Sequence, residues 1–329
     1  MNTLRNKNIL VTGGAGFIGS NLVKALVNQH GAHVTVLDDL FTGDLAHLEG
    51  IKHRFVQGSV EDAQLVNECV SNADIVFHLA SRNIIVSNQN PREDLSVNVS
   101  GGFNVFEACL LHKVARVVYA STSSVYGNPE RLPVSEEDRK DFLNFYSASK
   151  FSAEVYAQTF YEVFQLPITI VRYSNVYGPH QSPTNPYCGV IGKFIKAALS
   201  DQALFIHGDG EHTRDYTYVD DAVKATIAAA LYPVAVGEAY NIGTGIETSV
   251  NELADTILTV TKSASSIEYV ENRDIDNICR RVINIAKAKS DLRYQPEHTI
   301  KKGLQKTIDW FLHSYERVVG LMVVVSIMA

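Results

Sequence analysis

Tyr146 and Lys150 are the two residues of this chain whose types and spacing most directly suggest chemistry. They follow a polar, acidic loop and open an apolar periodic run, so we place them at the start of a helix. Because a helix turns once in about 3.6 residues, their side chains share one face, roughly 6 Å apart. A phenol titrates near pH ~10, and a nearby cation favours the phenolate. The pair is therefore a candidate base, although a packed aromatic residue and a solvated lysine at this spacing also arise by chance.

A run of glycines near the N-terminus is the second such feature. The stretch Gly13–Gly19 lies between an apolar strand pattern at 8–12 and a helical pattern, and a second strand pattern at 33–37 ends in Asp38. Glycine permits the tight turn and lets pyrophosphate approach the backbone N–H groups at a helix N-terminus. A carboxylate at the place of Asp38 holds adenosine ribose hydroxyls and repels a 2′-phosphate. We therefore predict NAD, with a capping or solvated Asp38 as the alternative and with Asp39 as a neighbour that makes no ribose contact.

Strand and helix patterns alternate through the first half of the chain. Strands are expected at 8–12, 33–37, 54–57, 74–80, 116–120 and 169–175, with helices at 61–71 and 91–112 between them. Such alternation predicts an α/β fold with a doubly wound parallel sheet of the Rossmann type. Ligands bind beyond the carboxyl ends of the strands in such sheets, where Asp38, Ala80 and Ser121–Ser123 fall.

The C-terminal third alternates less regularly. A loop rich in Pro, Asn and Ser at 178–187 is followed by helices expected near 189–200, 219–232, 250–262 and 300–315 and by a strand at 204–206. We predict an NAD-binding domain over 1–175, to which part of 215–245 returns, and a smaller C-terminal substrate-binding lobe over 176–317. Residues 318–329 form an apolar tail that is too short for a membrane span of roughly 20 residues. We expect this tail to pack on the body or on a partner subunit, and membrane contact is the less favoured alternative.

Composition excludes several classes of protein. The chain has 329 residues, 46% hydrophobic and 20% charged content and a net charge of −7, which is typical of a globular protein and gives no basic stripe for nucleic acid. The four cysteines lack Cys-x-x-Cys spacing, which argues against a metal site and favours reduced thiols in the cytoplasm. The N-terminus is polar and leads directly into the first strand, so we expect no signal peptide.

Together these motifs resemble the extended short-chain dehydrogenase/reductase family, in particular its nucleotide-sugar epimerases and dehydratases. The resemblance covers about residues 8–311. It rests on Thr12–Gly19, Leu37–Leu40, His78–Ala80, Asn98–Gly101, Ser121–Gly127, Tyr146–Lys150, Arg172–Pro179, Gly208–Gly210, Arg214–Tyr216 and Tyr240–Gly243.

The resemblance implies a role for each site residue. Tyr146 takes the proton of a sugar hydroxyl, with a pKa lowered by Lys150 and by the nicotinamide charge, while hydride passes to NAD. Thr122 hydrogen-bonds the same oxygen, and Ser123 could share this role. The expected cofactor residues are Gly13, Gly16, Phe17, Ile18, Gly19, Asp38, Ala80, Asn98, Tyr146, Lys150 and Tyr173. The expected substrate residues are Ser87, Thr122, Asn175, Arg214 and Arg273, of which the arginines suit a nucleotide diphosphate.

Departures from the family pattern bear on the substrate. The 4,6-dehydratases and the UDP-glucuronate decarboxylases carry acids directly after the catalytic Thr, where this chain has Ser123-Ser124. Epimerisation is therefore favoured. Cys279 and Arg280 both fall in the region that gates N-acetyl sugars, and which of them occupies the gate stays open. Ser59 replaces a common Asp near the adenine, which leaves a base contact by Asp62 open.

The resulting hypothesis is an NAD-dependent epimerase that inverts C4 of a UDP-hexose, either UDP-glucose and UDP-galactose or their N-acetyl analogues. The alternatives are another nucleotide-sugar dehydratase or oxidoreductase and, from a different class, a non-catalytic NAD-binding protein. The resemblance also implies a homodimer joined through the 91–112 helix and the helix of Tyr146. Its interface candidates are Cys109, Leu110, Phe160 and Phe164.

Overall fold

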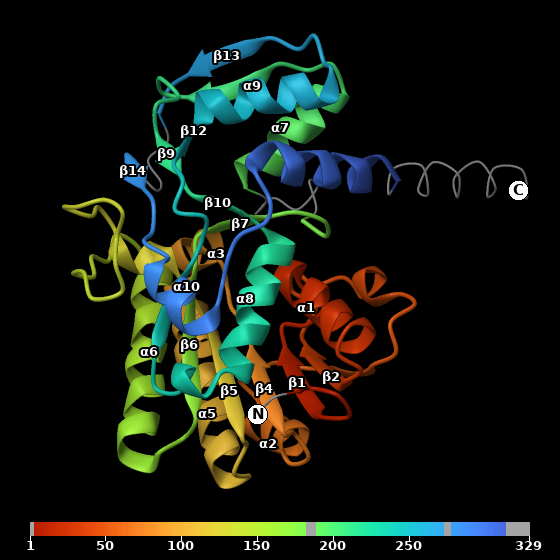
Figure 1. Cartoon of the computed structure of the whole chain (residues 1–329), viewed down its shortest axis with the longest axis vertical. Coiled ribbons are helices and arrows are strands. Elements are labelled where there is room, and N and C mark those ends of the chain that lie inside the picture. The colour runs from red at the N-terminus through yellow and green to blue at the C-terminus, as the bar shows by residue number, and fades with distance from the viewer. Residues whose placement is uncertain (1–2, 182–188, 273–277, 314–329) are drawn as a thin grey trace, which may run out of the picture.

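A seven-stranded parallel sheet forms the centre of the molecule. The computed structural model describes residues 3–181, 189–272 and 278–313 (Figure 1). The sheet contains β1 (Asn8–Thr12), β2 (His33–Asp38), β3 (Arg54–Gln57), β4 (Ile75–His78), β5 (Arg116–Thr122), β6 (Ile168–Tyr173) and β11 (Ala239–Ile242). Their order is β11-β6-β5-β4-β1-β2-β3, and every pair is parallel. The predicted doubly wound α/β fold is confirmed.

The strand order reverses between β1 and β4, and this reversal places the ligand site. Thr12 at the end of β1 lies between Leu37 of β2 and His78 of β4. The chain leaves β1 and β4 toward opposite sides, which opens a crevice at their carboxyl ends. The glycine-rich stretch begins at this point. Thr122 ends β5 beside Tyr173 of β6, so the second group of predicted residues lies at the same edge.

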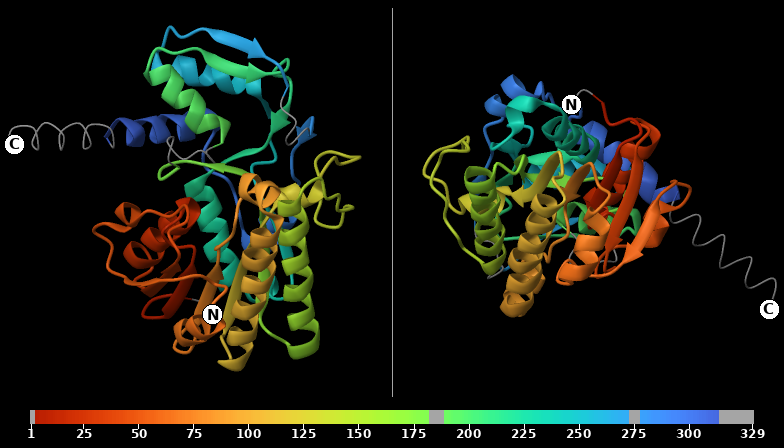
Figure 2. Two further views of the ribbon diagram at one scale, coloured as in Figure 1. Left: turned by 180° about the vertical axis from the view of Figure 1, so that it is seen from behind. Right: turned by 90° about the horizontal axis from the view of Figure 1, so that it is seen from below.

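Helices cover both faces of the sheet. On one face α1 (Phe17–Asn28) contacts α8 (Val219–Leu231), and on the other α5 (Gly101–Leu111) contacts α2 (Ala63–Val70) and α6 (Phe145–Phe164). Seen from below, the two helical layers enclose the sheet (Figure 2). Alternation along β1 shows the cause, because Ile9 and Val11 enter one hydrophobic core and Leu10 enters the other.

The helix expected at 91–112 is interrupted. It consists of α4 (Pro91–Asp94), a π-helical turn η2 (Leu95–Ser100) and α5. In this turn Asn98 bonds both backbone groups of Arg82, and its amide also donates to Asp94, four residues before it. A Cβ on Gly101 would lie 2.5 Å from the Val60 side chain, so this glycine lets the start of α5 pack closely against Val60. Single π turns of this kind are frequent at functional sites.

A smaller lobe lies over the carboxyl edge of the sheet (Figure 1). It is built from α7 (Val190–Leu199), β8 (Leu204–His207), α9 (Val250–Thr261) and β13 (Ile267–Val270), and β8 pairs with β13. Further short elements are β7 (Asn175–Tyr177), β9 (Thr213–Arg214), β10 (Tyr216–Tyr218), β12 (Thr248–Ser249), β14 (Arg280–Arg281), α3 (Ile84–Gln89), α10 (Ala286–Leu292) and the 3-10 turns η1 (Leu45–Leu48), η3 (Ser123–Tyr126) and η4 (Pro233–Ala235). A helix also runs from residue 300 to the end of the described chain at 313.

Two of the expected interface residues lie inside the subunit. Cys109 and Phe160 are buried in the core beneath α5 and α6, so they are wrong as candidates for direct subunit contact. The predicted candidate Phe164 is exposed, and the other large apolar side chains exposed on these two helices are Leu111, Phe145, Val155, Tyr156 and Val163. Among residues 3–181, 189–272 and 278–313, no helix has the length and apolar content needed to cross a membrane. The predicted tail at 318–329 lies outside the described residues.

Candidate active site

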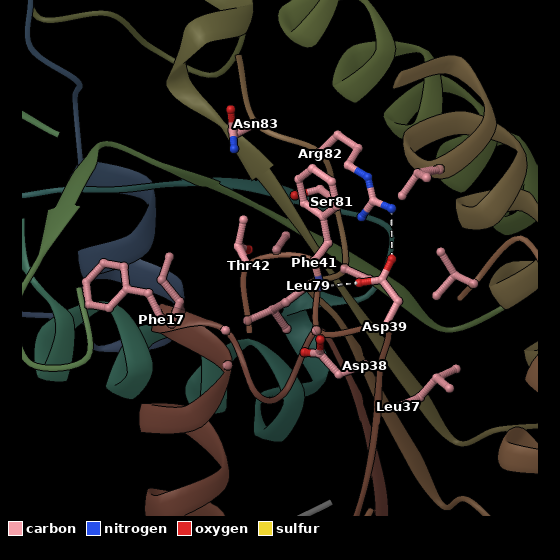
Figure 3. Close-up of a pocket in the computed structure, with 18 of the residues that line it drawn as sticks. Phe17, Leu37, Asp38, Asp39, Phe41, Thr42, Leu79, Ser81, Arg82 and Asn83 are labelled. Atoms are coloured by element: carbon pink, nitrogen blue, oxygen red, sulfur yellow. Dashed lines mark hydrogen bonds and ion pairs between the residues drawn. The ribbon is translucent and has the colours of Figure 1, made fainter. Parts of the chain in front are cut away.

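A cavity of about 310 Å³ opens at the carboxyl edge of β1, β2 and β4 (Figure 3). Apart from Asn98, every predicted cofactor residue lines it: Gly13, Gly16, Phe17, Ile18, Gly19, Asp38, Ala80, Tyr146, Lys150 and Tyr173. The lining also includes Gly58 to Val60, Leu79, Ser81 to Asn83 and Asp39, Phe41 and Thr42. The structure thus brings the glycine-rich stretch and the Tyr146/Lys150 pair to one cavity.

The glycines of this cavity have no room for side chains. Gly13 has φ +69°, and a Cβ there would lie 2.7 Å from the Ala80 nitrogen. A Cβ on Gly19 would lie 2.0 Å from the Gly13 carbonyl oxygen. Gly16 is the N-cap of α1, so the free N–H groups of that helix begin here. This narrow backbone cradle at a helix N-terminus fits the pyrophosphate of a dinucleotide.

Asp38 is held in place by the backbone. Its Oδ2 accepts from the Ala15 N–H at 2.9 Å and its Oδ1 from the Leu40 N–H at 2.8 Å. Burial raises the pKa of this carboxyl, and the two N–H groups oppose that rise. Each oxygen retains capacity for one more donor, which suits ribose hydroxyls.

Thr122 lies beside Tyr146 at the other end of the cavity, close enough for its side chain to lower the pKa of Tyr146. Thr122 ends β5, and its hydroxyl also accepts from the Ser124 N–H at 3.1 Å, which starts η3. Tyr146 lies in the first turn of α6, which Asn144 caps by accepting from the Ser147 N–H at 2.8 Å. Ser123 is buried at the start of η3. The predicted Thr/Tyr arrangement is therefore assembled by one strand end and one helix start.

Within the chain itself, burial raises the pKa of Tyr146 to about 12, and Asp94 adds to the rise, while the Thr122 side chain and the Arg281 charge oppose it. The expected lowering by Lys150 is not found among these effects, and the lowering by the nicotinamide charge stays a prediction. Burial also lowers the pKa of Lys150 to about 7, against the attraction of Glu154 and Asp94. The Lys150 Nζ lies 4.4 Å from the centre of the Tyr119 ring. Because desolvation disfavours both charged forms, the resting site favours a neutral phenol beside a partly protonated amine.

Sequence reasoning missed a buried carboxylate close to both catalytic groups. Asp94 Oδ1 accepts from Ser87 Oγ at 2.5 Å, Asn98 Nδ2 at 2.6 Å and Ser149 Oγ at 2.9 Å. Ser87 is fully buried, and its hydroxyl also bonds the Asn83 carbonyl, so it supports Asp94 and does not line the cavity. Asn98 likewise lies behind the lining and hydrogen-bonds Arg82 and Asp94. Its spacing of four residues from Asp94 was the one feature of the sequence that could have predicted this contact.

A second buried network lies behind Thr122. Arg172 pairs with Glu154, with Nη2 2.7 Å from Oε2, and donates from Nη1 to the Tyr126 hydroxyl at 2.9 Å. Ser121 donates to the same Glu154, and Tyr126 donates to Asn241 at 2.7 Å. The network joins β5, β6, α6 and β11, and it fixes the end of β5 on which Thr122 stands. Glu154 lies one turn after Lys150, which was the only sequence signal for it.

Two of the predicted substrate residues, Asn175 and Arg214, lie on short strands that follow β6 and β8. Asn175 begins β7, and Arg214 on β9 donates to the Thr213 and Ile278 carbonyls at 2.9 and 2.8 Å. Arg273 lies outside the described residues. In the gate region Arg280 is exposed and pairs with Glu247, whereas Arg281, which the sequence did not single out, is 4% exposed and is the cation that affects Tyr146.

Known proteins share this architecture along nearly their whole length. Residues 9–243 match the model of a protein family described as "NAD dependent epimerase/dehydratase family". The chain belongs to this family. It is 36% identical to a UDP-glucose 4-epimerase of Mycolicibacterium smegmatis, covering 92% of this chain and 97% of that one. It is 37% identical to a UDP-N-acetyl-alpha-D-glucosaminuronate decarboxylase of Bacillus cytotoxicus, covering 93% and 98%. A UDP-glucose 4-epimerase of Thermotoga maritima, solved with UDP-glucose, superposes with a TM-score of 0.90 at 33% identity, covering 94% and 100%.

Membership of this NAD-dependent family identifies the cofactor as NAD. The cavity agrees, because its glycine cradle lies beside α1 and Asp38 stands at the end of β2. Asp62, whose contact with the base was left open, instead caps α2 by accepting from the Leu65 N–H at 3.0 Å, and Ser59 lines the cavity.

Proposed function

We propose that this epimerase/dehydratase family member is a 4-epimerase that inverts C4 of a UDP-hexose through a transient 4-keto sugar. The observation that carries the proposal is the placement of Thr122 beside Tyr146, with Lys150 one turn further along α6. Ser123 and Ser124 follow Thr122, in the positions where the dehydratases it resembles carry acids. Serine hydroxyls cannot act as the base at C5 that loss of water requires.

The residues divide the chemistry between them. Tyr146 accepts the proton of the C4 hydroxyl, and Thr122 hydrogen-bonds the same oxygen and relays the proton. When bound in the cavity, NAD would supply the reversible hydride acceptor that inversion at C4 requires. Because burial raises the Tyr146 pKa to about 12, its deprotonation needs nearby positive charge; Arg281 already opposes the rise, and we assign a second positive charge to protonated Lys150, one turn along α6.

The buried carboxylates of the catalytic end are already engaged by the protein. Asp94 is surrounded by three donors, and Glu154 is paired with Arg172. The two carboxylates that line the described cavity, Asp38 and Asp39, belong to the end of β2. This distribution supports epimerisation over elimination of water, because the hydrogen bonds and the ion pair of Asp94 and Glu154 oppose their use as the base at C5.

The nucleotide-sugar substrate is supported by the relatives, whose names specify UDP-linked sugars. We assign Asn175, Arg214 and Arg273 to its diphosphate, where the planar guanidinium can pair with phosphate oxygens. We also propose a homodimer joined through α5 and α6, on which Leu111, Val155, Val163 and Phe164 are exposed. Sedimentation at micromolar concentration tests this, and a monomer would reject it.

The reaction is tested by incubating the purified protein and NAD with UDP-glucose and, separately, with UDP-N-acetylglucosamine. A new chromatographic peak of unchanged mass is the expected product. A product lighter by water indicates a dehydratase, and accumulation of reduced NAD indicates a dehydrogenase. Tyr146→Phe should lower turnover by about 10²- to 10⁴-fold with NAD still bound. Tyr156→Phe, on the exposed side of the same helix, is the matched control and should keep wild-type turnover.

A further inference from the structure

Arg82 is a buried cation in the wall of the NAD cavity. It follows β4, lines the cavity together with Asp39 and Phe41, and is only 8% exposed. Asn98 fixes its backbone from both sides, since the Arg82 N–H donates to Oδ1 at 2.7 Å and the Asn98 amide donates to the Arg82 carbonyl at 3.2 Å. The position of this side chain is therefore set by the fold.

Two carboxylates and one ring hold the guanidinium. Nη2 lies 2.8 Å from Asp39 Oδ2, and Nε lies 2.6 Å from Glu93 Oε1. The guanidinium carbon stands 4.1 Å from the centre of the Phe41 ring. Asp39 also accepts from the Phe41 N–H at 3.0 Å, so the loop after β2 and the segment after β4 are joined across the cavity wall (Figure 3). Asp39 is thus a partner of Arg82 and more than a neighbour of Asp38.

This group lies where the cofactor forms differ. NAD and its 2′-phosphorylated form, NADP, are distinguished at the adenosine ribose, where a carboxylate favours the hydroxyl and an arginine accommodates the phosphate. Here both residue types occur next to Asp38. Asp39 and Arg82 line the cavity, whereas Glu93 contacts the guanidinium from outside the lining. Asp39 and Glu93 therefore pair with one guanidinium at the end of the cavity that Asp38 also lines.

We propose that Asp39, supported by Glu93, determines the preference for NAD over NADP by occupying and neutralising Arg82. A 2′-phosphate entering this end meets Asp38 and Asp39 as like charges, while Nη2 and Nε of Arg82 are already paired with carboxylates. Removing the Asp39 charge without changing its shape releases Nη2 for a phosphate oxygen, because Glu93 holds only Nε. The preference therefore depends on a charge pair that spans two loops, in addition to Asp38.

The test measures dissociation constants of NAD and NADP by titration calorimetry, independently of catalysis. Asp39→Asn should improve binding of NADP relative to NAD by about tenfold or more. Glu93→Gln should shift the ratio in the same direction by less, because it leaves the Asp39 pair intact. Asp44→Asn is the matched control, since Asp44 caps η1 in the same loop without lining the cavity, and it should leave the ratio unchanged.

The double variant Asp39→Asn/Arg82→Met separates this proposal from simple relief of repulsion. If Arg82 supplies the phosphate contact, the double variant loses most of the gain of Asp39→Asn. A double variant that binds NADP as tightly as Asp39→Asn overturns the proposal, as does an unchanged ratio in Asp39→Asn. If Arg82→Met does not fold, Asp39→Asn/Arg82→Lys serves instead and should keep part of the gain, because lysine retains the charge without the planar fork.

Discussion

The two ends of the NAD cavity differ in the parts of the chain that form them. The end near α1 is formed by backbone, with glycines that approach Ala80 and each other so closely that no Cβ fits. The end near α6 is formed by side chains that the core holds from behind, through the pair of Glu154 and Arg172. The shape of one end requires glycines, which lack a Cβ, and the shape of the other requires a buried pair of charged side chains.

This difference determines how each end can fail. The backbone end lies within residues 12–20 and the adjacent strand ends, so a single methyl group can block it locally. The side-chain end joins residues far apart in the chain, such as Tyr126 to Asn241, so damage to it spreads into the core. Variants that block cofactor binding should therefore separate cleanly from variants that lower stability.

The largest effect on NAD affinity is expected from Gly19→Ala. Its Cβ would lie 2.0 Å from the Gly13 carbonyl oxygen and 2.8 Å from Gly14 Cα, so the cradle must distort. We expect NAD affinity to fall by about a hundredfold, as measured by calorimetry. Gly50→Ala is the control, because its Cβ meets nothing within 4 Å although its φ is +73°. NAD affinity close to wild type in Gly19→Ala would show that backbone closeness does not define this end.

The next effect concerns the other end. Glu154→Gln leaves the Arg172 guanidinium buried without its carboxylate, which costs about 3–5 kcal/mol of unfolding free energy. Chemical denaturation with and without NAD measures this loss, and NAD affinity per folded molecule should stay within about twofold. The exposed Lys224–Glu297 pair supplies the control, and Lys224→Ala should leave the thermal midpoint unchanged. Equal losses in the two variants would contradict the argument from burial.

The backbone end could be predicted from sequence because its signals are local. Parallel strands buried on both faces appear as apolar runs, so β1, β2 and β3 were placed to within one residue. Two short motifs also have a direct physical reason to form a site. They are the glycines followed by Asp38 and the pair of Tyr146 with Lys150.

The rest depends on tertiary contacts. The two-residue strands β9, β12 and β14 carry no periodicity, and the π turn in the 91–112 region gives no sequence signature. The rise that burial causes in the Tyr146 pKa was missed because burial cannot be read from a helix pattern. The pairing of Arg82 with Asp39 joins residues on different loops, so it required the fold.

Burial of Lys150 at the side-chain end should make the stability of the protein depend on pH. Its pKa is about 7 in the folded protein and near 10.5 when unfolded, so the unfolded chain binds more protons between these values. Stability of the wild type should therefore rise with pH from about 7 toward 10, relative to Lys150→Met, by at most about 1.4 kcal/mol per pH unit. Urea unfolding at pH 6.5, 8 and 9.5 measures the slopes. Lys196→Met, on the exposed face of α7, should retain the wild-type slope. Identical slopes in Lys150→Met and the wild type would mean that Lys150 is not desolvated.

The smallest effect distinguishes a helix cap from a cofactor contact at the backbone end. Asp62 accepts the Leu65 N–H at the start of α2, so Asp62→Ala should cost about 1 kcal/mol and lower the thermal midpoint by about 2 °C. Asn is an equally good cap, and Asp62→Asn should restore the midpoint. Because Asp62 does not line the cavity, NAD affinity should stay within about twofold in both variants. If Asp62→Ala instead weakens NAD binding while the midpoint holds, the carboxylate contacts the adenine, and this end of the cavity then depends on a side chain as well as on its backbone.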